Sequence, residues 1–320
     1  MRLTTDSANG AARPGRSYVV ITPCRDEAKY ARATLDSMIA QTERPTLWVV
    51  VDDGSKDGTT EILEDYAAKH PWIRVVRRQD RGARVVGAGV MEAFYYGLDT
   101  VDMNAFDYVC KLDLDLDLPK QYFETLMDRM EADPRMGACS GKPYFLQDGR
   151  AVSEKCGDEH AVGMTKFYRT ACFQQIGGFV RELMWDGIDT HRSRMLGWKA
   201  ASWDDESLRF IHLRPMGTSH KSWLTGRTRH GRGQYYMGTS PGYMFVSALN
   251  RALHPPVVLG GLAMLWGYFK AMATGGKRYD DLAFRRFVRA YQRACLFKGK
   301  RKATQQLEDV QATVWRGPSR

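Results

Sequence analysis

The chain lacks acidic side chains over one long stretch. Between Glu206 and Asp280, 73 consecutive positions hold neither aspartate nor glutamate. The stretch therefore contains the whole positive excess of the 320-residue chain, whose formal net charge is +10. We expect an anionic partner to bind in this basic region. Ten basic residues lie in it: Arg209, Arg214, Lys221, Arg227, Arg229, Arg232, Arg251, Lys270, Lys277 and Arg278.

Other absences exclude several classes of protein. No CxxC pair or other short cysteine spacing occurs, which argues against a zinc knuckle or a disulfide framework and indicates reduced thiols. Residues 1–16 lack the apolar core of a signal peptide and are expected to form a flexible lead. No run of 18 apolar residues occurs, so no ordinary membrane-spanning helix is expected. The six cysteines are Cys24, Cys110, Cys139, Cys156, Cys172 and Cys295.

Two common nucleotide-binding motifs are also missing. The chain contains neither GxGxxG in the required setting nor GxxxxGK[ST], so neither a Rossmann dehydrogenase nor a P-loop enzyme is supported. The composition, 43% hydrophobic and 26% charged, is typical of a globular protein. The length suffices for one large domain or two modest ones.

Short apolar runs alternate with helical patterns in the first part of the chain. This alternation predicts an α/β fold with a mainly parallel sheet covered by helices on both faces. Further on, strands are expected near 165–169 and 208–213 and a helix near 186–196; from 220 onward the pattern is helical, interrupted at Pro241, Pro255–Pro256 and Gly275–Gly276. The first part predicts strands at 18–22, 46–51, 73–77 and 108–112, and helices at 28–40, 58–69, 84–99 and 119–132.

Acidic and turn residues follow three of these strands, in "PCRDE", "DDGSKDGT" and "DLDLDLP". Because parallel strands end at one edge of a sheet, this clustering is typical of a functional site. Asp113, Asp115 and Asp117 alternate with leucine, so they either bind a hard cation or face solvent along an edge strand. The apolar "FDYVCKL" before them and Pro119 after them favour the end of an interior strand.

The segment "VVVDDGSKDGT" forms a sharp turn between a buried strand and a helix. Gly54 and Gly58 permit a tight backbone, and Asp57 can cap the helix that follows. Asp52 and Asp53 are not needed for the turn. We therefore expect this acidic pair to be free to hydrogen-bond a nucleoside, as an acidic residue does in dinucleotide folds.

Taken in order, these motifs resemble family 2 glycosyltransferases with the GT-A fold. The resemblance rests on "ITPCRDEAKYARATLDSMIAQTERPTLWVVVDDGSKDGT", the DxD-type "KLDLDLDLP" and "IGGFVRELMWDGIDTHRSRMLGW". It implies a nucleotide-diphosphate sugar donor, a divalent metal (Mg²⁺ or Mn²⁺) and inversion at the anomeric carbon. It also implies a GT-A catalytic domain at 17–219, followed by a basic helical region at 220–300 and a tail at 301–320.

The resemblance assigns the metal and the diphosphate to the DxD pair, Asp113 and Asp115. The family often has a further acid directly after this pair, where the chain has Leu116. His212 ends a strand where some relatives place a histidine near the metal or the diphosphate; a packed, hydrogen-bonded histidine is the alternative.

Other positions match the donor pocket of the family. Asp53, with Asp52 beside it, matches the acid near the nucleobase, and Pro23 and Glu27 match the first-strand motif that frames the same pocket. Arg84 lies where the family places a basic residue near the donor, although a charge on a helix surface explains it equally well.

Inversion needs a carboxylate that takes the proton of the acceptor hydroxyl. The family supplies it from an ED motif, and here Asp186 matches, eleven positions before Gly197, with Trp185 in place of the glutamate. That departure leaves Asp189 as a second candidate. The structural alternative is that Asp186 caps the helix, while Asp189 pairs on its surface with Arg192.

The basic region allows several interpretations. Arg229 and Arg232 lie at helical spacing and either bind the leaving diphosphate or form a solvated face. The apolar run "VVLGGLAMLWGYF" (257–269), followed by Lys270, Lys277 and Arg278, forms either a core helix or a helix lying on an anionic membrane surface. Nucleic acid is a rival partner, but acids able to hold a metal make a diphosphate the simpler one.

We therefore expect an inverting, metal-dependent glycosyltransferase that acts on a glycan or lipid-linked acceptor. We expect it in the cytoplasm, dissolved or on the cytoplasmic face of the membrane. A nucleotidyltransferase is one alternative, although "TPCRDEAKY" lacks the glycine-rich loop of that class. A non-catalytic sugar-nucleotide binder or assembly scaffold is the other.

Overall fold

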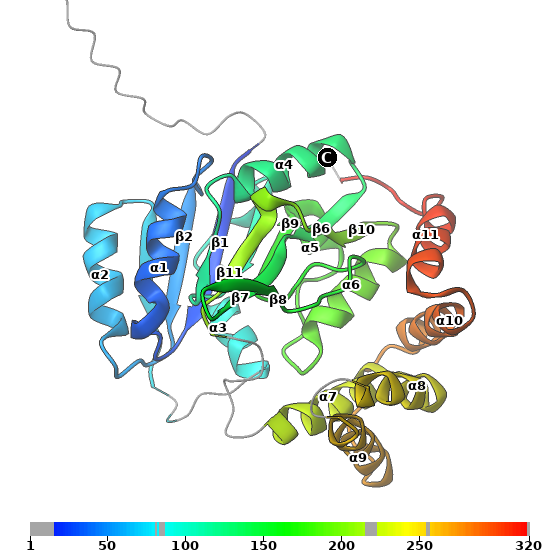
Figure 1. The fold of residues 1–320 in the computed structure, drawn as a ribbon. Coiled ribbons are helices and arrows are strands. Elements are labelled where there is room, and N and C mark those ends of the chain that lie inside the picture. The colour runs from blue at the N-terminus through cyan, green and yellow to red at the C-terminus, as the bar shows by residue number, and fades with distance from the viewer. Residues whose placement is uncertain (1–15, 81, 83–86, 215–222, 254–256, 319–320) are drawn as a thin grey trace, which may run out of the picture.

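The computed structural model describes residues 16–80, 82, 87–214, 223–253 and 257–318 (Figure 1). The expected flexible lead, 1–16, therefore lies outside the described residues, except for Arg16. This arginine forms ion pairs with Asp128 at 2.5 Å and Glu131 at 2.7 Å.

A seven-stranded sheet forms the centre of the protein, in the order β10-β6-β9-β4-β1-β2-β3. All neighbours are parallel except β9, which is antiparallel to β4 and β6. The expectation of a mainly parallel α/β sheet is thus confirmed. The strands are β1 Tyr18–Cys24, β2 Leu47–Asp52, β3 Ile73–Arg77, β4 Tyr108–Leu112, β6 Met136–Ser140, β9 Thr165–Arg169 and β10 Lys199–Ser202.

The sheet is buried on both faces, which explains its near-continuous apolar strands. In β1, Tyr18 and Val20 face one hydrophobic core, whereas Val19 and Ile21 face the other. Helices α1, α2 and α4 cover the first face, and α3 and α5 cover the second. The helices of this part are α1 Ala28–Ile39, α2 Thr59–Lys69, α3 Ala88–Leu98, α4 Tyr122–Ala132, α5 Thr170–Gln175 and α6 Trp185–Met195, with short 3₁₀ helices η1 Met103–Ala105 and η2 Glu206–Leu208.

A second sheet of four strands, in the order β5-β11-β7-β8, was not expected from the sequence. The acidic segment after β4 leads directly into this sheet at β5. β5 pairs antiparallel with β11, which places His212 opposite Leu116. Its strands are β5 Leu116–Asp117, β7 Lys142–Gln147, β8 Arg150–Ser153 and β11 Arg209–His212.

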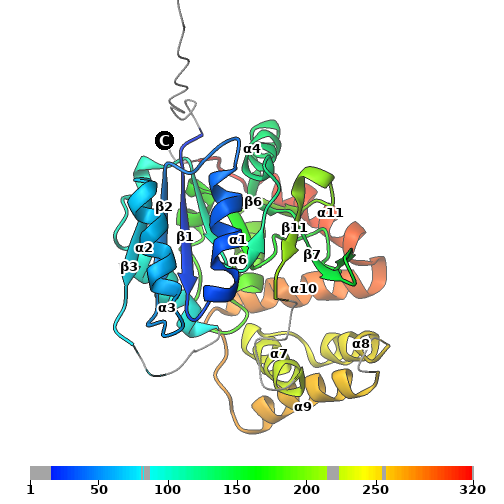
Figure 2. The same cartoon turned by 60° about the vertical axis from the view of Figure 1, so that its left-hand side comes forward.

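Three helices of the C-terminal part form a separate group. In both views α7, α8 and α9 lie beneath the end of the central sheet toward which β1 runs (Figures 1 and 2). Helices α7 and α9 touch along their backbones: a Cβ atom on Gly231 would lie 1.9 Å from the Met264 carbonyl oxygen, so only glycine fits there. The helices are α7 Trp223–Met237, α8 Pro241–Ala252 and α9 Leu259–Ala273.

The chain then returns to the part that carries the central sheet through α10 Leu282–Lys298 and α11 Lys300–Gln311. The expected tail, 301–320, is therefore helical in α11 and packed as far as Trp315. Arg135 Nη2 donates to the Glu308 carbonyl at 2.7 Å, and the Trp315 ring packs edge-on against Trp198 with centroids 5.5 Å apart.

The described residues contain neither a disulfide bond nor a helix able to span a membrane. All six cysteines lie in described residues as free thiols, and four of them are buried. None of the described helices is long and apolar enough to span a bilayer.

Candidate active site

The acidic segment after β4 sorts its side chains by chemistry. Its leucines, 112, 114, 116 and 118, are buried in one hydrophobic core, while the three aspartates differ in exposure. Asp113 keeps part of its surface in solvent and Asp115 is buried, whereas Asp117 is exposed on β5. The three carboxylates therefore do not share one side of a strand. Asp113 and Asp115 remain close enough to repel each other.

Cationic side chains meet this acidic pair. Lys111, at the end of β4, forms an ion pair with Asp113 and donates to the Gly163 carbonyl at 2.9 Å. Arg214 Nε lies 3.2 Å from Asp115 Oδ2. Protein around the carboxyl group raises the pKa of Asp113; Lys111 opposes this rise and Asp115 adds to it. Lys111 and Arg214 thus offset part of the negative charge of the pair, while the two carboxylates still repel each other.

His212 lies between two carboxylates. Its Nδ1 is 3.0 Å from Glu154 Oε2, and its Nε2 is 3.8 Å from Asp115 Oδ2. Burial lowers the pKa of His212, but the hydrogen bonds and charges of Asp115 and Glu154 outweigh that effect and raise the pKa to about 9. Without a bound cation, the imidazolium therefore serves as a counter-ion to the buried acids.

One carboxylate oxygen indicates how a divalent ion would fit. Asp115 Oδ1 is buried and has no hydrogen-bond partner in the described part of the chain, an arrangement that normally calls for a ligand or water. The described residues contain no converging group of three or more His, Cys, Asp or Glu side chains. Mg²⁺, however, commonly takes only one or two carboxylates and completes its shell with phosphate oxygens and water. Asp113 and Asp115 fit that demand, with His212 as a further ligand once it has lost its proton.

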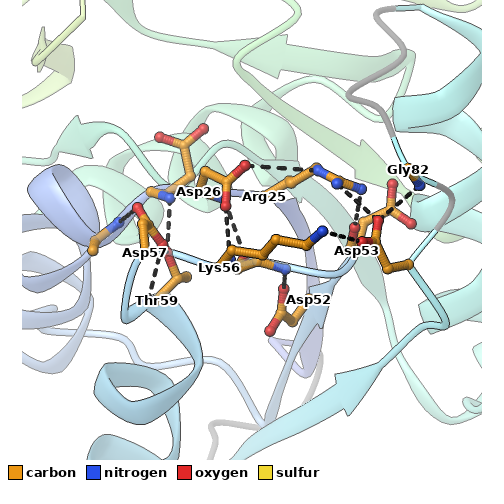
Figure 3. A network of polar contacts seen from close by, with 12 residues as sticks. Arg25, Asp26, Asp52, Asp53, Lys56, Asp57, Thr59 and Gly82 are labelled. Atoms are coloured by element: carbon orange, nitrogen blue, oxygen red, sulfur yellow. Dashed lines mark hydrogen bonds and ion pairs between the residues drawn. The ribbon is translucent and has the colours of Figure 1, made fainter.

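A polar network surrounds the acid expected near the nucleobase (Figure 3). Asp53 is buried; its Oδ1 accepts from Arg78 at 3.1 Å and its carbonyl from Arg25 at 2.8 Å. Arg25 also binds Asp80, as does Lys56, both at 2.8 Å. Lys56, a backbone N–H and Arg25 together hold the pKa of Asp80 well below its usual range. Asp53 thus belongs to a network of charged side chains that connects the ends of β1, β2 and β3.

The neighbouring Asp52 has a different role from the one expected. Its Oδ1 accepts from the Ser55 backbone N–H at 2.9 Å, and its Oδ2 accepts from the Thr60 hydroxyl. Both oxygens therefore hold the turn after β2 and the start of α2, and Figure 3 shows the first of these two contacts. The expectation that Asp52 is not needed for the turn is wrong, and Asp53 is the better candidate for a nucleoside contact.

The same loops fix the first-strand motif. Asp57 accepts from the backbone N–H groups of Thr59 and Ala28, at 3.1 and 3.0 Å, so it caps the starts of α2 and α1 together. Pro23 lies in β1, in register with β2. Glu27 is buried and forms an ion pair with Arg214. The predicted framing residues therefore do lie at the carboxyl edge of the sheet.

Asp186 lies in the first turn of α6, with its side chain exposed. It does not cap the helix, because Met184 occupies the N-cap position and no side-chain cap bond forms there. A Cβ atom on Gly163 would lie 3.4 Å from Asp186 Oδ2, and the Gly163 carbonyl binds Lys111, the partner of Asp113. Gly163 therefore lies beside Asp186 and also contacts Lys111, the partner of Asp113 in the acidic pair.

Asp189 has a structural environment. It is 1% exposed, and both its oxygens lie within 2.7 Å of Lys166 Nζ, while the Tyr168 hydroxyl also donates to it. Burial raises the pKa of Asp189, and Lys166 opposes the rise. The expected surface pair with Arg192 is wrong. Because Asp189 has no room for a substrate hydroxyl, Asp186 is the stronger candidate for the base.

Trp185, which replaces the family's glutamate, covers two buried lysines. Its ring centroid lies 5.4 Å from Lys111 Nζ and 5.5 Å from Lys166 Nζ, distances at which cation–π attraction operates. The ring also packs edge-on against Phe179, with centroids 4.8 Å apart. The indole therefore shields the ion pairs that hold Asp113 and Asp189.

The buried pair of Lys166 and Asp189 yields a prediction about stability. We expect Asp189→Ala to reduce the free energy of unfolding by about 3–5 kcal/mol, because Lys166 would remain charged and buried without its partner. The double variant Lys166→Met, Asp189→Leu should regain most of this loss. Chemical denaturation followed by circular dichroism measures both. Asp65→Ala, which breaks the exposed pair with Lys69, is the control and should change little; an equally small effect of Asp189→Ala would contradict the prediction.

The remaining predicted residues are placed elsewhere. Arg84 lies outside the described residues. Arg229 and Arg232, on α7, line a groove of about 520 Å³ together with Lys270 of α9. The Asp186 charge acts on His230, opposing the effect of burial, which lowers the pKa of that histidine. Helix α7 therefore runs close to Asp186, while its two arginines border the groove with α9.

Four contributors to the site were given no role there from the sequence: Arg25, Lys111, Trp185 and Arg214. Arg25 stands within the quoted "PCRDE", and Lys111 is a charge at the end of an apolar strand, so both carried a local signal. Arg214 carried none, because its partner Glu27 lies 187 positions earlier in the chain.

Part of the chain is similar in sequence to curated proteins. A poly-β-1,6-N-acetyl-D-glucosamine synthase of Staphylococcus aureus is 26% identical over 121 residues, which are 38% of this chain and 27% of that protein. The chain thus spans about a quarter of the length of the curated relatives that it matches.

Two solved structures share the fold. One is a mannosyltransferase from Pyrobaculum calidifontis in complex with GDP-Man and Mn²⁺; it has a TM-score of 0.50 and 20% identity, and the match covers 95% of this chain and 88% of that one. The other is GalNAc-T7 with UDP, GalNAc and Mn²⁺, with a TM-score of 0.55, 15% identity, and coverage of 88% and 58%.

The family comparison covers the part of the chain that carries β1 to β9. Residues 19–176 match the family model described as "Glycosyl transferase family 2". This segment contains the acidic edge formed by Asp53, Asp113 and Asp115, in the fold that both solved neighbours share. Residues 19–176 are therefore a glycosyltransferase family 2 domain of GT-A fold.

Proposed function

We propose that the protein is an inverting glycosyltransferase that transfers a sugar from a nucleotide-diphosphate donor to a hydroxyl group of a glycan or lipid-linked acceptor. The observation that carries this proposal is the pairing of a buried, unsatisfied carboxylate oxygen on Asp115 with an exposed carboxylate on Asp186. Asp115 lies in the family 2 domain, and Asp186 follows shortly after its end, beside Gly163, whose carbonyl binds the Lys111 that pairs with Asp113. The first calls for a cation and the second is accessible to a substrate.

The donor nucleotide binds over the ends of β1 and β2. Asp53, fixed by Arg25 and Arg78, offers a carboxylate toward the nucleobase or ribose. Glu27, through Arg214, connects this side of the pocket with Asp115. The ligands in the two solved neighbours, GDP-Man and UDP, belong to the same chemical class. They support a sugar nucleotide here without identifying the base.

A divalent metal is part of this proposal. Asp113 and Asp115, with His212, would hold Mg²⁺ or Mn²⁺, which supplies positive charge against the leaving diphosphate. Lys111 keeps Asp113 oriented through its ion pair and its bond to Gly163. His212 would serve as a ligand only in its neutral form.

Asp186 removes the proton from the acceptor hydroxyl as the oxygen attacks the anomeric carbon. Its exposed position leaves the carboxylate open to the acceptor, and Gly163 beside it leaves space for the sugar because it has no side chain. The Asp186 carbonyl accepts from Lys166 at 2.7 Å, which fixes the first turn of α6. Attack from the face opposite the leaving group inverts the configuration.

Product analysis tests this proposal against its alternatives. Incubated with a panel of nucleotide sugars and Mn²⁺, the protein should slowly release the nucleoside diphosphate of its donor, because water replaces the acceptor. It should also show a thermal shift with that diphosphate that requires Mn²⁺. A nucleotidyltransferase would instead release pyrophosphate from a nucleoside triphosphate and a sugar phosphate. A scaffold would bind the donor and release nothing, and either result would contradict the proposal.

A further inference from the structure

The hairpin of α8 and α9 exposes an unusual amount of apolar surface. Of the 21 large hydrophobic side chains that are exposed in the described residues, 11 lie between 241 and 272. Monomeric proteins seldom leave such a concentration in water unless it binds something. The residues are Phe245, Val246, Leu249, Leu253, Val257, Val258, Leu259, Leu262, Trp266, Phe269 and Met272; we call them the apolar patch.

The patch is ordered by helical spacing. In α9, Leu259, Leu262, Trp266 and Phe269 recur every three or four residues and are 38–63% exposed, so they form one stripe along the helix. In α8, residues 245, 249 and 253 form a second stripe. Val257 and Val258, both exposed, connect the two stripes at the turn between the helices. Exposed apolar side chains thus follow both helices of the hairpin.

The opposite faces of the two helices hold the hairpin together. Met244 and Ala248 of α8 are buried in the same small core as Met264 and Tyr268 of α9. A Cβ atom on Gly261 would lie 2.4 Å from the Ala248 carbonyl oxygen, so the helices approach closely. The outward stripes are therefore not needed for folding of the helical group, whose apolar contacts are already made inside.

The charged side chains of α7, α8 and α9 are all basic. Between Glu206 and Asp280 the chain has no acidic residue, so nothing on α7, α8 or α9 repels an anion. Lys270 is exposed one helical turn after Trp266, with its Nζ 6.0 Å from the indole centroid. An apolar surface on helices whose only charged side chains are basic is complementary to a lipid layer with anionic headgroups.

A groove beside the patch offers a place for a headgroup. It lies between α7 and α9, has a volume of about 520 Å³, and is lined by Arg229, Arg232 and Lys270, with Thr228 and Thr274. Guanidinium, ammonium and hydroxyl groups in one groove are suited to phosphate oxygens. Because Lys270 belongs both to the groove and to the border of the apolar stripe, the two features adjoin.

The position of α9 suits a docking surface. Both views place α9 on the side of the helical group that faces away from the central sheet (Figures 1 and 2). A membrane in contact with this helix would lie beyond α7, and α7 would remain between the bilayer and Asp186.

We propose that the apolar patch of α8 and α9 docks the protein on an anionic lipid membrane. The side chains of the patch enter the interface, and Arg229, Arg232 and Lys270 bind lipid phosphate groups in the adjoining groove. This inference goes beyond the proposed function, since docking needs neither donor nor metal. A second copy of the chain fits the patch less well, because a symmetric interface would bring two acid-free, basic surfaces together.

Vesicle flotation with the full chain tests the docking. The protein should float with vesicles of phosphatidylcholine that contain about one-third phosphatidylglycerol, and much less with pure phosphatidylcholine. The variant Leu262→Glu, Trp266→Glu should reduce partitioning at least about tenfold, since two anchoring side chains are lost. Lys270→Glu should reduce the preference for the anionic vesicles about tenfold.

The control is Phe297→Glu, because Phe297 is 86% exposed on α10, outside the patch. It should bind vesicles as the unchanged protein does. Failure of the unchanged protein to float, or an equal loss with Phe297→Glu, would overturn the proposal. So would dimers in size-exclusion chromatography that Leu262→Glu, Trp266→Glu abolishes without any vesicle binding. Slow donor hydrolysis should persist in that double variant, which separates loss of docking from loss of the catalytic fold.

Discussion

Replacing Asp186 by asparagine is expected to lower kcat for sugar transfer by about 100- to 10,000-fold, the range that a general base contributes. Asparagine keeps the size of the side chain but cannot take a proton. The KM for the donor should change little, because Asp186 faces the acceptor side of the site. Initial rates of nucleoside diphosphate release, measured with and without acceptor, give both constants.

The fold should not be affected by this change. Asp186 is exposed and does not cap α6, so the free energy of unfolding should stay within about 0.5 kcal/mol. Glu182→Gln is a matched control, since Glu182 lies just before α6 and forms an exposed pair with Lys277 at 2.8 Å. Transfer at a near-normal rate in Asp186→Asn would refute the assignment of the base.

Replacing Asp115 by asparagine is expected to reduce transfer by about a thousandfold at ordinary metal concentrations. The change removes the negative charge next to which a divalent cation would bind, and such a cation contributes several kcal/mol to stabilising the charge of the leaving group. The Mn²⁺ concentration for half-maximal activity should rise at the same time. A titration of activity with Mn²⁺ in the two proteins measures both effects.

Asp117→Asn provides the comparison for Asp115. It changes an aspartate two positions later in the same motif. The Asp117 side chain is exposed on β5, and the residue lies opposite Ile211 in the strand pairing. Its activity and its Mn²⁺ requirement should be close to those of the unchanged protein. If Asp115→Asn behaved like Asp117→Asn, the acidic pair would have no role in holding a metal.

Much of the central fold could be predicted because its signals are local. Buried strands such as "TLWVVV" need only a short apolar run, and the turn residues after them mark the functional edge. The second sheet gave no such signal: β5 has two residues, and β8 is largely exposed, so neither shows a hydrophobic period. β5 forms through pairing with the distant β11, whereas β8 forms a hairpin with its neighbour β7.

The residues of the candidate site also fall into those that the local sequence indicates and those that it does not. The DxD aspartates, Asp53 and Asp186 stood out because of their order and neighbours in the sequence. The partner of Asp189 could not be found, since Lys166 comes from β9, the strand that runs antiparallel within the sheet. Helical spacing alone predicted a surface pair with Arg192. Tertiary burial overrode that local rule.

The path of the last helices affects how the enzyme can be divided. Phe284 and Val288 of α10 pack against Ile188 of α6, and a Cβ atom on Gly197, just after α6, would collide with the backbone of Gln311. A fragment ended near residue 219 would therefore strip the helix that presents Asp186 of its outer covering. We therefore expect a fragment that also carries α10 and α11 to be more stable than one that ends near residue 219.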